Sequence, residues 1–469
     1  MNLTELLDGT TSRWPQKPAF IEGDTIVSYA ELGDTIARMT AQLRAFGMIP
    51  GTRVGLCHPN SVAYVALTFA LWRLQAIVVP IPTECTSEET TAITETMQLE
   101  AVISQTPGGE SVTLTPEGYI TRLTPATLPD NHGLNIAFIR FTSGTTHERK
   151  GVVLSHETVR DRVVAANAAL RIGPEDTVMW CLPMAHHFLI TIVLYLSQGA
   201  TIVLTRQVLA RPFLETANRW RASVLYASPF HYALLARDRS DLTLPSVRLA
   251  VSTTCALPED VAEDFVRRFG LPLVQALGII ELGLVSLNAD DPRGRWNSVG
   301  RPLKTHRVRI VAPEADGVGE VAIAGPGFFD AYAAPWLPRE NVLHDGWFHT
   351  GDLGWLDADG FLFLVGRKAA VINLAGRKVF PEEIETVLNR HPAVLESRVF
   401  GRRHAHLGEV VEAEVVLAQP HPEAEALRDF CREHLAPYKV PTRLHVVSRL
   451  PRTTATGKIR RETALVSHE

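Results

Sequence analysis

The sequence has little cysteine and no excess of basic residues. Its five cysteines are scattered and form no CxxC pair, which argues against a disulfide framework or a cysteine-bound metal. The formal net charge is −5, with 46 Lys and Arg against 51 Asp and Glu. This balance excludes the strongly basic surface that is typical of nucleic-acid-binding proteins. We therefore expect reduced cysteines, no bound transition metal and no nucleic-acid partner.

Long hydrophobic runs are also missing. The longest, such as FLITIVLYL, fall short of the roughly 20 residues that a membrane-spanning helix needs. The N-terminal stretch MNLTELLDGTTSRWPQKPAF contains acidic residues and lacks the apolar core of a signal peptide. We therefore predict a cytoplasmic protein without a membrane span.

The patterns that are present indicate an α/β protein. With 469 residues, the chain is long enough for at least two domains. Short β-branched runs such as RVGLC, AIVVPI and VRLAVS alternate with helical stretches such as SVAYVALTFALWRLQ and DVAEDFVRRFG. This alternation predicts parallel sheets covered by helices. After about residue 300, close-set strands and turns predict a small antiparallel or barrel-like subdomain, followed by a compact α/β tail.

One stretch, FTSGTTHERKGVVLSH at 141–156, concentrates hydroxyl groups beside a lysine. Hydroxyls and the backbone N–H groups around a glycine form a concave set of donors that suits phosphate oxygens. The spacing is not that of a Walker A loop. Taken alone, the stretch predicts either a phosphate-binding loop or a solvated turn. The loop would lie between two strands, ahead of a helix that begins near Ser155.

Four motifs, in this order, resemble the adenylate-forming superfamily of acyl-CoA synthetases, peptide-synthetase adenylation domains and luciferases. They are TSGTT with the KG that follows, ALGIIE, TGDLG with its later GRK, and PRTTATGKIRR. The resemblance covers almost the whole chain. It implies an N-terminal core for ATP and an acid (1–366), with layered parallel sheets, helices and a barrel-like subdomain. It also implies a small, mobile α+β lid (367–469).

The resemblance implies which residues bind ATP and magnesium. Glu281 matches a carboxylate that helps to hold Mg²⁺, and one carboxylate suffices where phosphate oxygens complete the shell. Asp352 would accept both ribose hydroxyls, and Arg367 would hold the ribose or phosphate side. Lys458 would reach the α-phosphate and the acyl carboxylate. The implied nucleotide-binding residues are Thr142, Ser143, Gly144, Thr145, Thr146, Lys150, Leu277, Gly278, Asp352 and Arg367, with Glu281 and Lys458 as catalytic residues.

Each of these roles has a plainer alternative. Asp352 is also typical of a turn, Arg367 of a surface cation, Glu281 of a helix N-terminus and Lys458 of an exposed tail.

The segment WCLPMAHHFLITIVLYLSQGA falls in the family's substrate-helix region. Amino-acid-activating members place an Asp near its start, where this chain has His186 and His187. These two histidines are candidates for substrate contacts or, alternatively, for core histidines bonded to the backbone. The predicted acid-binding residues are His186, His187, Phe188, Ile190, Ser228, Phe230, Ile280 and Leu284.

Some positions depart from the family pattern. Leu277 stands where an aromatic ring commonly stacks on adenine, and Ile280 stands where a Thr is usual. Further departures are His147 and Arg149 in the hydroxyl-rich loop, and Thr253, Thr254 and Cys255 in a turn that is usually glycine-rich. These changes predict weaker nucleotide contacts.

The resemblance implies that the chain activates a non-amino-acid carboxylic acid, aryl or medium-chain alkyl, to acyl-AMP. It would then transfer the acyl group to a thiol. The implied cofactors are ATP and Mg²⁺. The implied acceptor is coenzyme A or the phosphopantetheine of an acyl carrier protein. Three alternatives stay open: an amine or other non-thiol acceptor, a catalytically silent nucleotide binder, and an oxygenase that acts on acyl-AMP.

Overall fold

The computed structural model describes residues 1–108, 111–115, 118–125, 130–141, 151–205, 209–374, 377–404, 408–418, 423–452 and 459. These residues form two compact units. The described residues of unit 1 fall within 1–142, 150–307 and 324–346, and those of unit 2 fall within 308–323 and 347–469. The boundary between core and lid at 366/367 stays a prediction.

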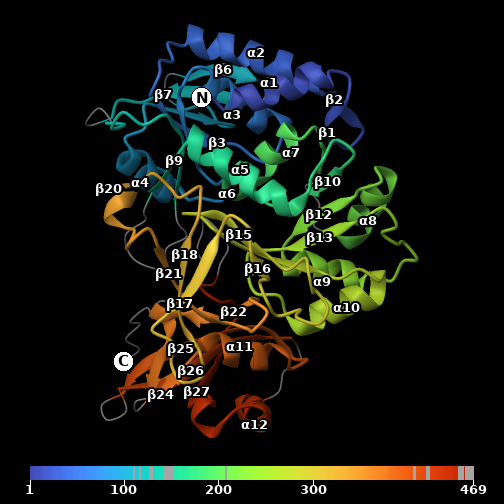
Figure 1. Cartoon of the computed structure of the whole chain (residues 1–469), viewed down its shortest axis with the longest axis vertical. Helices are drawn as coiled ribbons and strands as arrows, with labels where there is room; N and C mark the ends of the chain where they lie inside the picture. The colour runs from blue at the N-terminus through green and yellow to red at the C-terminus, as the bar shows by residue number, and fades with distance from the viewer. Residues whose placement is uncertain are drawn as a thin grey trace. The chain divides into compact units, whose positions relative to one another are not determined.

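Unit 1, as far as the structure describes it, contains two nine-stranded sheets (Figure 1). The first has the spatial order β16 (Arg301–Pro302), β15 (Gly283–Leu287), β14 (Val274–Ile279), β13 (Leu249–Ser252), β12 (Val224–Ala227), β10 (Thr177–Trp180), β11 (Thr201–Leu204), β1 (Pro18–Glu22), β2 (Thr25–Ser28). The second has the order β20 (Trp336–Pro338), β19 (Ala331–Ala333), β9 (Gly151–Ser155), β8 (Ile136–Phe141), β4 (Ile77–Pro80), β3 (Arg53–Cys57), β5 (Ala101–Ser104), β7 (Gly118–Arg122), β6 (Ser111–Thr115).

The central strands of both sheets are parallel, as the sequence predicts. In the first sheet β10 pairs in parallel with β11 and β12, and β12 pairs in parallel with β13. In the second sheet β3 pairs in parallel with β4 and β5. Every residue of β4, β11 and β12 is buried, which explains why these runs are apolar throughout instead of alternating.

Helices cover these sheets. The helices of unit 1 are α1 (Thr4–Arg13), α2 (Tyr29–Ala45), α3 (Val62–Arg73), α4 (Ser87–Met97), α5 (His156–Leu170), α6 (Met184–His187), the π-helix η1 (Phe188–Ile192), α7 (Val193–Ser197), α8 (Ala210–Arg219), α9 (Pro229–Arg237), α10 (Glu259–Phe269) and the 3-10 helix η2 (Arg339–Asn341). Helices α8, α9 and α10 lie along the sheet that contains β12 and β13, and together they enclose one hydrophobic core (Figure 1).

Helix α5 contacts strands of both sheets, β8 and β9 in one and β15 in the other. Its start is fixed by Ser155, whose side-chain oxygen accepts a hydrogen bond from the Thr158 N–H at 3.2 Å. The two predicted strands and the predicted helix that begins near Ser155 are therefore confirmed, and the residues between the strands lie outside the described residues.

Unit 2 contains two smaller sheets. The first has the order β17 (Arg307–Val311), β18 (Gly319–Ala324), β21 (Phe348–Leu356), β22 (Leu362–Arg367), and Arg307 and Ala324 group with unit 1. The second comprises β24 (Arg377–Val379), β23 (Ile372–Leu374), β26 (Gly408–Leu417), β25 (Val394–His404) and β27 (Arg443–Val446). The helices of unit 2 are η3 (Lys368–Ala370), α11 (Pro381–Asn389), α12 (Ala424–His434) and η4 (Pro437–Lys439).

The antiparallel strands expected after residue 300 are present, because β18 pairs with β21, and β21 with β22, in that sense. Unit 2 also has its own hydrophobic core, with buried residues from its strands and from α11 and α12.

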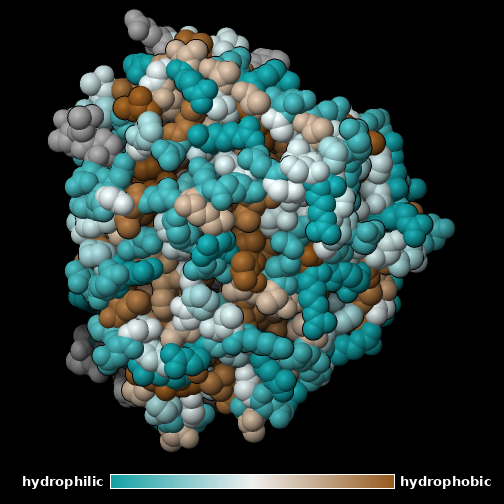
Figure 2. Space-filling model, turned by 45° about the horizontal axis from the view of Figure 1, so that its top comes forward, coloured by the Kyte–Doolittle hydropathy of each residue, from teal (hydrophilic) through white to brown (hydrophobic). Residues whose placement is uncertain are grey.

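The visible face in Figure 2 shows hydrophilic residues with hydrophobic ones in small areas between them. Large exposed hydrophobic side chains include Val164, Leu209 and Phe230. Among the described residues, no helix is both long and apolar enough to span a membrane.

A close contact at Gly300 gives a test of this packing. Gly300 has φ +86°, and a Cβ placed there would lie 2.2 Å from the backbone carbon of Leu287. Gly270, at the end of α10, has φ +71° with open space around it. We expect Gly270→Ala to cost about 1 to 2 kcal/mol of stability. Gly300→Ala should cost more than about 4 kcal/mol, because backbone atoms must also move. Thermal unfolding measures both, and equal melting temperatures would contradict the described contact.

Candidate functional site

The hydroxyl-rich stretch connects two paired strands. In the β8–β9 pair, Arg140 lies opposite Val152, and Phe141 lies opposite Gly151. The paired strands therefore hold both ends of the connection. The predicted phosphate-binding residues Thr142, Ser143, Gly144, Thr145, Thr146 and Lys150, with the departures His147 and Arg149, lie outside the described residues.

Glu281 lies in the turn between β14 and β15, not at the start of a helix. Its side chain is 8% exposed, and the Tyr332 hydroxyl donates a hydrogen bond to Oε1 at 3.0 Å. Its backbone carbonyl accepts from the Phe329 N–H at 2.8 Å. Burial raises the pKa of Tyr332, and the Glu281 carboxylate adds to this rise, so the phenol keeps its proton. The Glu281 carboxylate is therefore held in one orientation.

Arg162, on the buried face of α5, joins this turn to a second segment, residues 327–330. Its Nη1 donates to the Ile280 carbonyl at 2.9 Å, and its Nε donates to the Gly327 carbonyl at 2.6 Å. A Cβ at Gly283 would approach the Arg162 side chain to 3.0 Å, and one at Gly327 to 2.7 Å. Both glycines therefore provide the space that the arginine occupies. Burial lowers the pKa of Arg162 to about 9, and the charges of Glu281 and Asp330 oppose this fall.

The same helix makes two more contacts with this second segment. Asp330 accepts a hydrogen bond from the Ser155 N–H at 2.6 Å and another from the Thr158 hydroxyl at 3.2 Å. Ser155, Thr158 and Arg162 are spaced by about one turn each, so they contact the segment from one side of the helix. Sequence reasoning missed both Arg162 and Tyr332. For Arg162 the available signal was a charged residue between the apolar residues of α5.

The remaining predicted residues of the turn differ in burial. Leu277 is half-buried, Gly278 is exposed, and the pairing of β14 with β15 shifts by a bulge between them. Ile280 is half-buried, and Leu284 is 3% exposed. The structure thus brings Ile280 and Glu281 together with Arg162. Contacts of these residues with adenine or with an acid stay predictions.

The predicted acid-binding helix is irregular, since α6 continues into the π-helix η1 and then α7. Such π-helical turns often occur at functional sites. His186, His187 and Ile190 are half-buried. The His187 ring contacts Trp180 edge-on, with 6.5 Å between ring centroids.

Phe188 lies in the aromatic core. Its ring centroid is 5.5 Å from that of Tyr64, and its ring is stacked on Phe138 at 6.4 Å. Only 2% of its surface is exposed. Its predicted contact with the acid stays a prediction, and in this structure the side chain serves packing.

Ser228 and Phe230 lie at the start of α9. The Ser228 hydroxyl is 2.7 Å from Nδ1 of His231, and Phe230 is 62% exposed. The predicted contact of these two residues with the acid also stays a prediction.

In unit 2, Asp352 and Arg367 form a cross-strand pair. They lie opposite each other on β21 and β22, and Arg367 Nε is 2.7 Å from Asp352 Oδ1. Arg367 also donates to the Thr350 carbonyl at 3.0 Å. Asp352 is 8% exposed, so it belongs to a sheet strand and is no solvated turn residue. The structure therefore brings together the two residues that the resemblance assigns to the ribose side.

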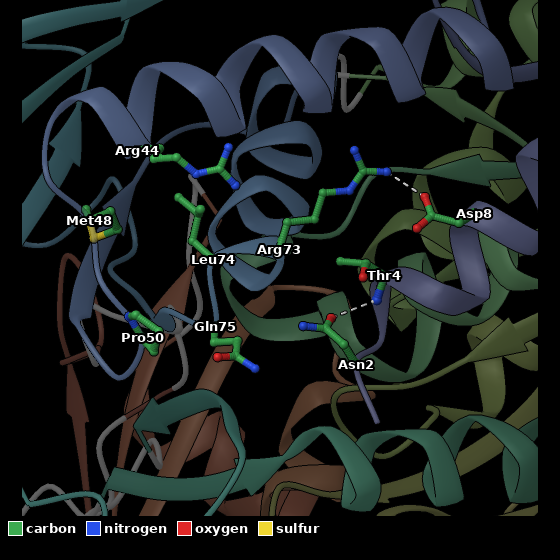
Figure 3. Close-up of a pocket in the computed structure, with 9 residues that line it drawn as sticks. All are labelled: Asn2, Thr4, Asp8, Arg44, Met48, Pro50, Arg73, Leu74 and Gln75. Carbon is green, nitrogen blue, oxygen red and sulfur yellow. Dashed lines mark hydrogen bonds and ion pairs between the residues drawn. The ribbon is translucent and has the colours of Figure 1, made fainter.

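A pocket of about 480 Å³ lies elsewhere in unit 1, between the start of α1 and the ends of α2 and α3 (Figure 3). On one side Arg73 pairs with Asp8 at 2.5 Å, and the Thr4 N–H donates to the Asn2 side chain at 3.0 Å. None of the residues that line this pocket belongs to the predicted site, so we assign it no part in the reaction.

Comparison with known proteins identifies the class. The family profile described as AMP-binding enzyme matches residues 7–333, and that of the AMP-binding enzyme C-terminal domain matches residues 383–458. The chain therefore belongs to the AMP-binding enzymes, the adenylate-forming superfamily that the motifs indicate. The predicted enzyme class, an AMP-forming acid–thiol ligase, and the predicted α/β fold class are confirmed.

Individual relatives match over nearly their whole length. Sulfoacetate–CoA ligase of Cupriavidus necator is 28% identical over 98% of this chain and 96% of its own. Feruloyl-CoA synthase of an Amycolatopsis species is 29% identical over 95% of this chain and 94% of its own. Solved o-succinylbenzoate CoA synthetase from Bacillus subtilis, in complex with its acyl-adenylate intermediate, is 25% identical, with a TM-score of 0.85 over 97% of this chain and 96% of that one. The same synthetase in complex with ATP and magnesium has a TM-score of 0.85 and 26% identity.

The turn that follows β13 contains a strained residue. Thr254, one of the departures from the family pattern, has φ +82°, which is unusual for a β-branched side chain. We expect Thr254→Gly to relieve this strain and to increase stability by about 1 to 3 kcal/mol. The control is Thr243→Gly, also on a loop but outside the positive-φ set, which should decrease stability. A lower melting temperature for Thr254→Gly would contradict the strained conformation.

Proposed function

We propose that this chain activates a non-amino-acid carboxylic acid, aryl or medium-chain alkyl, with ATP and transfers the acyl group to a thiol. The observation that carries the proposal is the match of both family profiles, together with relatives that are CoA ligases over almost the whole chain. The acceptor thiol is that of coenzyme A, or alternatively the phosphopantetheine of an acyl carrier protein.

The reaction has two steps. An oxygen of the acid's carboxylate attacks the α-phosphorus of ATP, the bond to the β-phosphate oxygen breaks, and acyl-AMP and pyrophosphate result. The thiol then attacks the acyl carbon, AMP leaves with the bonding electron pair, and the thiol proton passes to solvent. Positioning and charge neutralisation supply most of the catalysis in such phosphorus chemistry.

Each predicted residue has a role in this scheme. Thr142, Ser143, Thr145, Thr146 and Lys150 would hold the terminal phosphates. In unit 2, Asp352 would accept the ribose hydroxyls, and Arg367, bonded to Oδ1 of that carboxylate, orients it. Lys458 would align the acid's carboxylate with the α-phosphate, and it lies outside the described residues.

The Glu281 turn fits a magnesium ion that arrives with ATP. Among the described residues there is no group of three or more His, Cys, Asp or Glu side chains suited to a metal ion. One oriented carboxylate, Glu281, suits an ion whose other ligands are phosphate oxygens and water. When bound, Mg²⁺ neutralises charge on the phosphates. Glu281 would hold it, and the Tyr332 hydroxyl fixes the direction of the carboxylate.

Two other functions remain candidates. The departures at Leu277 and Ile280 keep open a catalytically silent nucleotide binder, and the acceptor could be an amine instead of a thiol. Pyrophosphate release with a panel of acids rejects the silent binder, and product analysis with coenzyme A or amines identifies the acceptor.

One prediction of the proposed function concerns the acid. The segment from Trp180 to Ala200 has no Asp or Glu to pair with a substrate ammonium. Burying that charge without a partner costs several kcal/mol, so an amino acid should react at least about 100-fold more slowly than its desamino counterpart. Pyrophosphate release with cinnamate against phenylalanine, and with hexanoate against norleucine, measures this. Equal or faster reaction of the amino acids would sink the proposed substrate class.

Another prediction of the proposed function concerns Lys458. Lys458→Ala should slow pyrophosphate release by at least about 100-fold, because it removes charge stabilisation in the transition state. Transfer from supplied acyl-AMP to coenzyme A should be much less affected. The exposed Lys304 is the control, and Lys304→Ala should leave both steps unchanged. Equal loss of both steps in Lys458→Ala would mean that this lysine does not act on adenylation alone.

A further inference from the structure

Nε of Arg140 and the hydroxyl of Tyr64 are among the buried side-chain donors of unit 1 that have no hydrogen-bond partner in the described structure. Arg140 is the next-to-last residue of β8, and Tyr64 lies in the first turn of α3. The Tyr64 side chain is completely buried. An unpaired buried donor is unfavourable, and more so when it carries a charge. The pair therefore needs a physical explanation.

The two groups lie within electrostatic reach of each other. Burial raises the pKa of Tyr64, and the positive charge of Arg140 opposes this rise. Burial lowers the pKa of Arg140 to about 10, and the charges of Glu281 and Tyr64 oppose this fall. The charge of Arg140 thus interacts with both Tyr64 and Glu281, and Arg140 keeps its positive charge at neutral pH.

Their position is next to the predicted substrate-binding segments. Side chains two residues apart on a strand point to the same face, so Arg140 shares the face of Phe138. Phe138 stacks on Phe188, the first residue of the π-helix, and Tyr64 packs against the same ring. Thr142, where the predicted phosphate-binding loop begins, follows Arg140 by two positions. The carboxyl ends of parallel strands, where β8 ends beside β4, are also where α/β proteins commonly bind ligands.

Arg162 shows what a structural arginine does in the same region. Its Nε and Nη1 both donate to backbone carbonyls, so it contributes to the fold directly. Nε of Arg140 makes no such bond with any residue that the structure describes, although Nη2 of Arg162 is unpaired as well. Nε of Arg140 therefore holds no backbone carbonyl in place.

We propose that Arg140 and Tyr64 form a receptor for an anionic oxygen group of a bound substrate, either a carboxylate of the acid or a phosphate of ATP. The identity of these two substrates rests on the proposed function. A guanidinium and a phenol are both donors, and together they offer charge-assisted hydrogen bonds to carboxylate or phosphate oxygens. The start of α3 adds a favourable helix dipole for an anion.

Three variants test the receptor. Arg140→Met removes the charge and keeps much of the side chain's length, Arg140→Lys keeps the charge, and Tyr64→Phe removes only the hydroxyl. The matched control is Arg160→Met on α5, where the arginine is paired with the neighbouring Asp161 at the surface. Because Nε of Arg140 and the Tyr64 hydroxyl lose no protein hydrogen bond, the melting temperatures should stay at or above that of the unchanged protein.

Calorimetric binding of ATP with Mg²⁺, of hexanoate and of adipate distinguishes the sources of the anion. Arg140→Met should weaken at least one of these ligands 10-fold or more, Arg140→Lys should recover part of the loss, and Tyr64→Phe should weaken the same ligand less. A loss for ATP alone identifies a phosphate, a loss for both acids identifies the reacting carboxylate, and a loss for adipate alone identifies a second acidic group.

Unchanged affinity for all three ligands in both Arg140→Met and Tyr64→Phe, with the fold intact, overturns the receptor. A buried water would then satisfy the two donors. This outcome is separate from failure of the proposed function, which appears as absence of pyrophosphate release from the unchanged protein across the panel of acids. Binding by calorimetry does not require turnover, so it decides on the receptor in either case.

Discussion

The described part of unit 1 depends on one buried guanidinium. Arg162 bonds to two carbonyl groups, of Ile280 and Gly327, that are 118 and 165 positions away in the sequence. These bonds attach the Glu281 turn and the segment before β19 to the same helix. A hydrogen bond from a charged donor is stronger than a neutral one, and burial protects it from competing water. The orientation of Glu281 follows from this contact and from Tyr332.

The same contact limits what the surrounding sequence can be. Gly283 and Gly327 both have positive φ, and any side chain at either position would meet the arginine. Asp330 must remain short and acidic, because it accepts bonds from the Ser155 N–H and from the Thr158 hydroxyl at the beginning of the same helix. Helix α5 therefore connects the turn that contains Gly283 with the segment that contains Gly327 and Asp330, and these three parts are far apart in the sequence.

Local signals predicted much of the fold. The start of α5 follows from the capping oxygen of Ser155, and the end of α10 follows from Gly270 in a left-handed conformation. Apolar β-branched runs identified the parallel strands, since both faces of those strands are covered. The motifs also placed Asp352 and Arg367 in one site, and their register across β21 and β22 agrees with that placement.

Long-range contacts could not be predicted in this way. Arg162 donates to backbone carbonyl groups. Every residue has such a carbonyl, so the sequence does not indicate which ones accept. The π-helical turn begins at Phe188, whose ring packs against Tyr64 and Phe138 from distant parts of the chain, and no local pattern predicted it. The conformation of Thr254 likewise opposes the preference of its residue type.

The cross-strand pair of Asp352 and Arg367 has a mechanical consequence. Arg367 is the last residue of β22, and the short helix Lys368–Ala370 begins directly after it. If the C-terminal domain rotates about this point, the pivot is attached by an ion pair to Asp352, the carboxylate that we propose to bind the ribose. Occupancy of the nucleotide and the angle of rotation would then be thermodynamically linked, and each would bias the other by the same free energy.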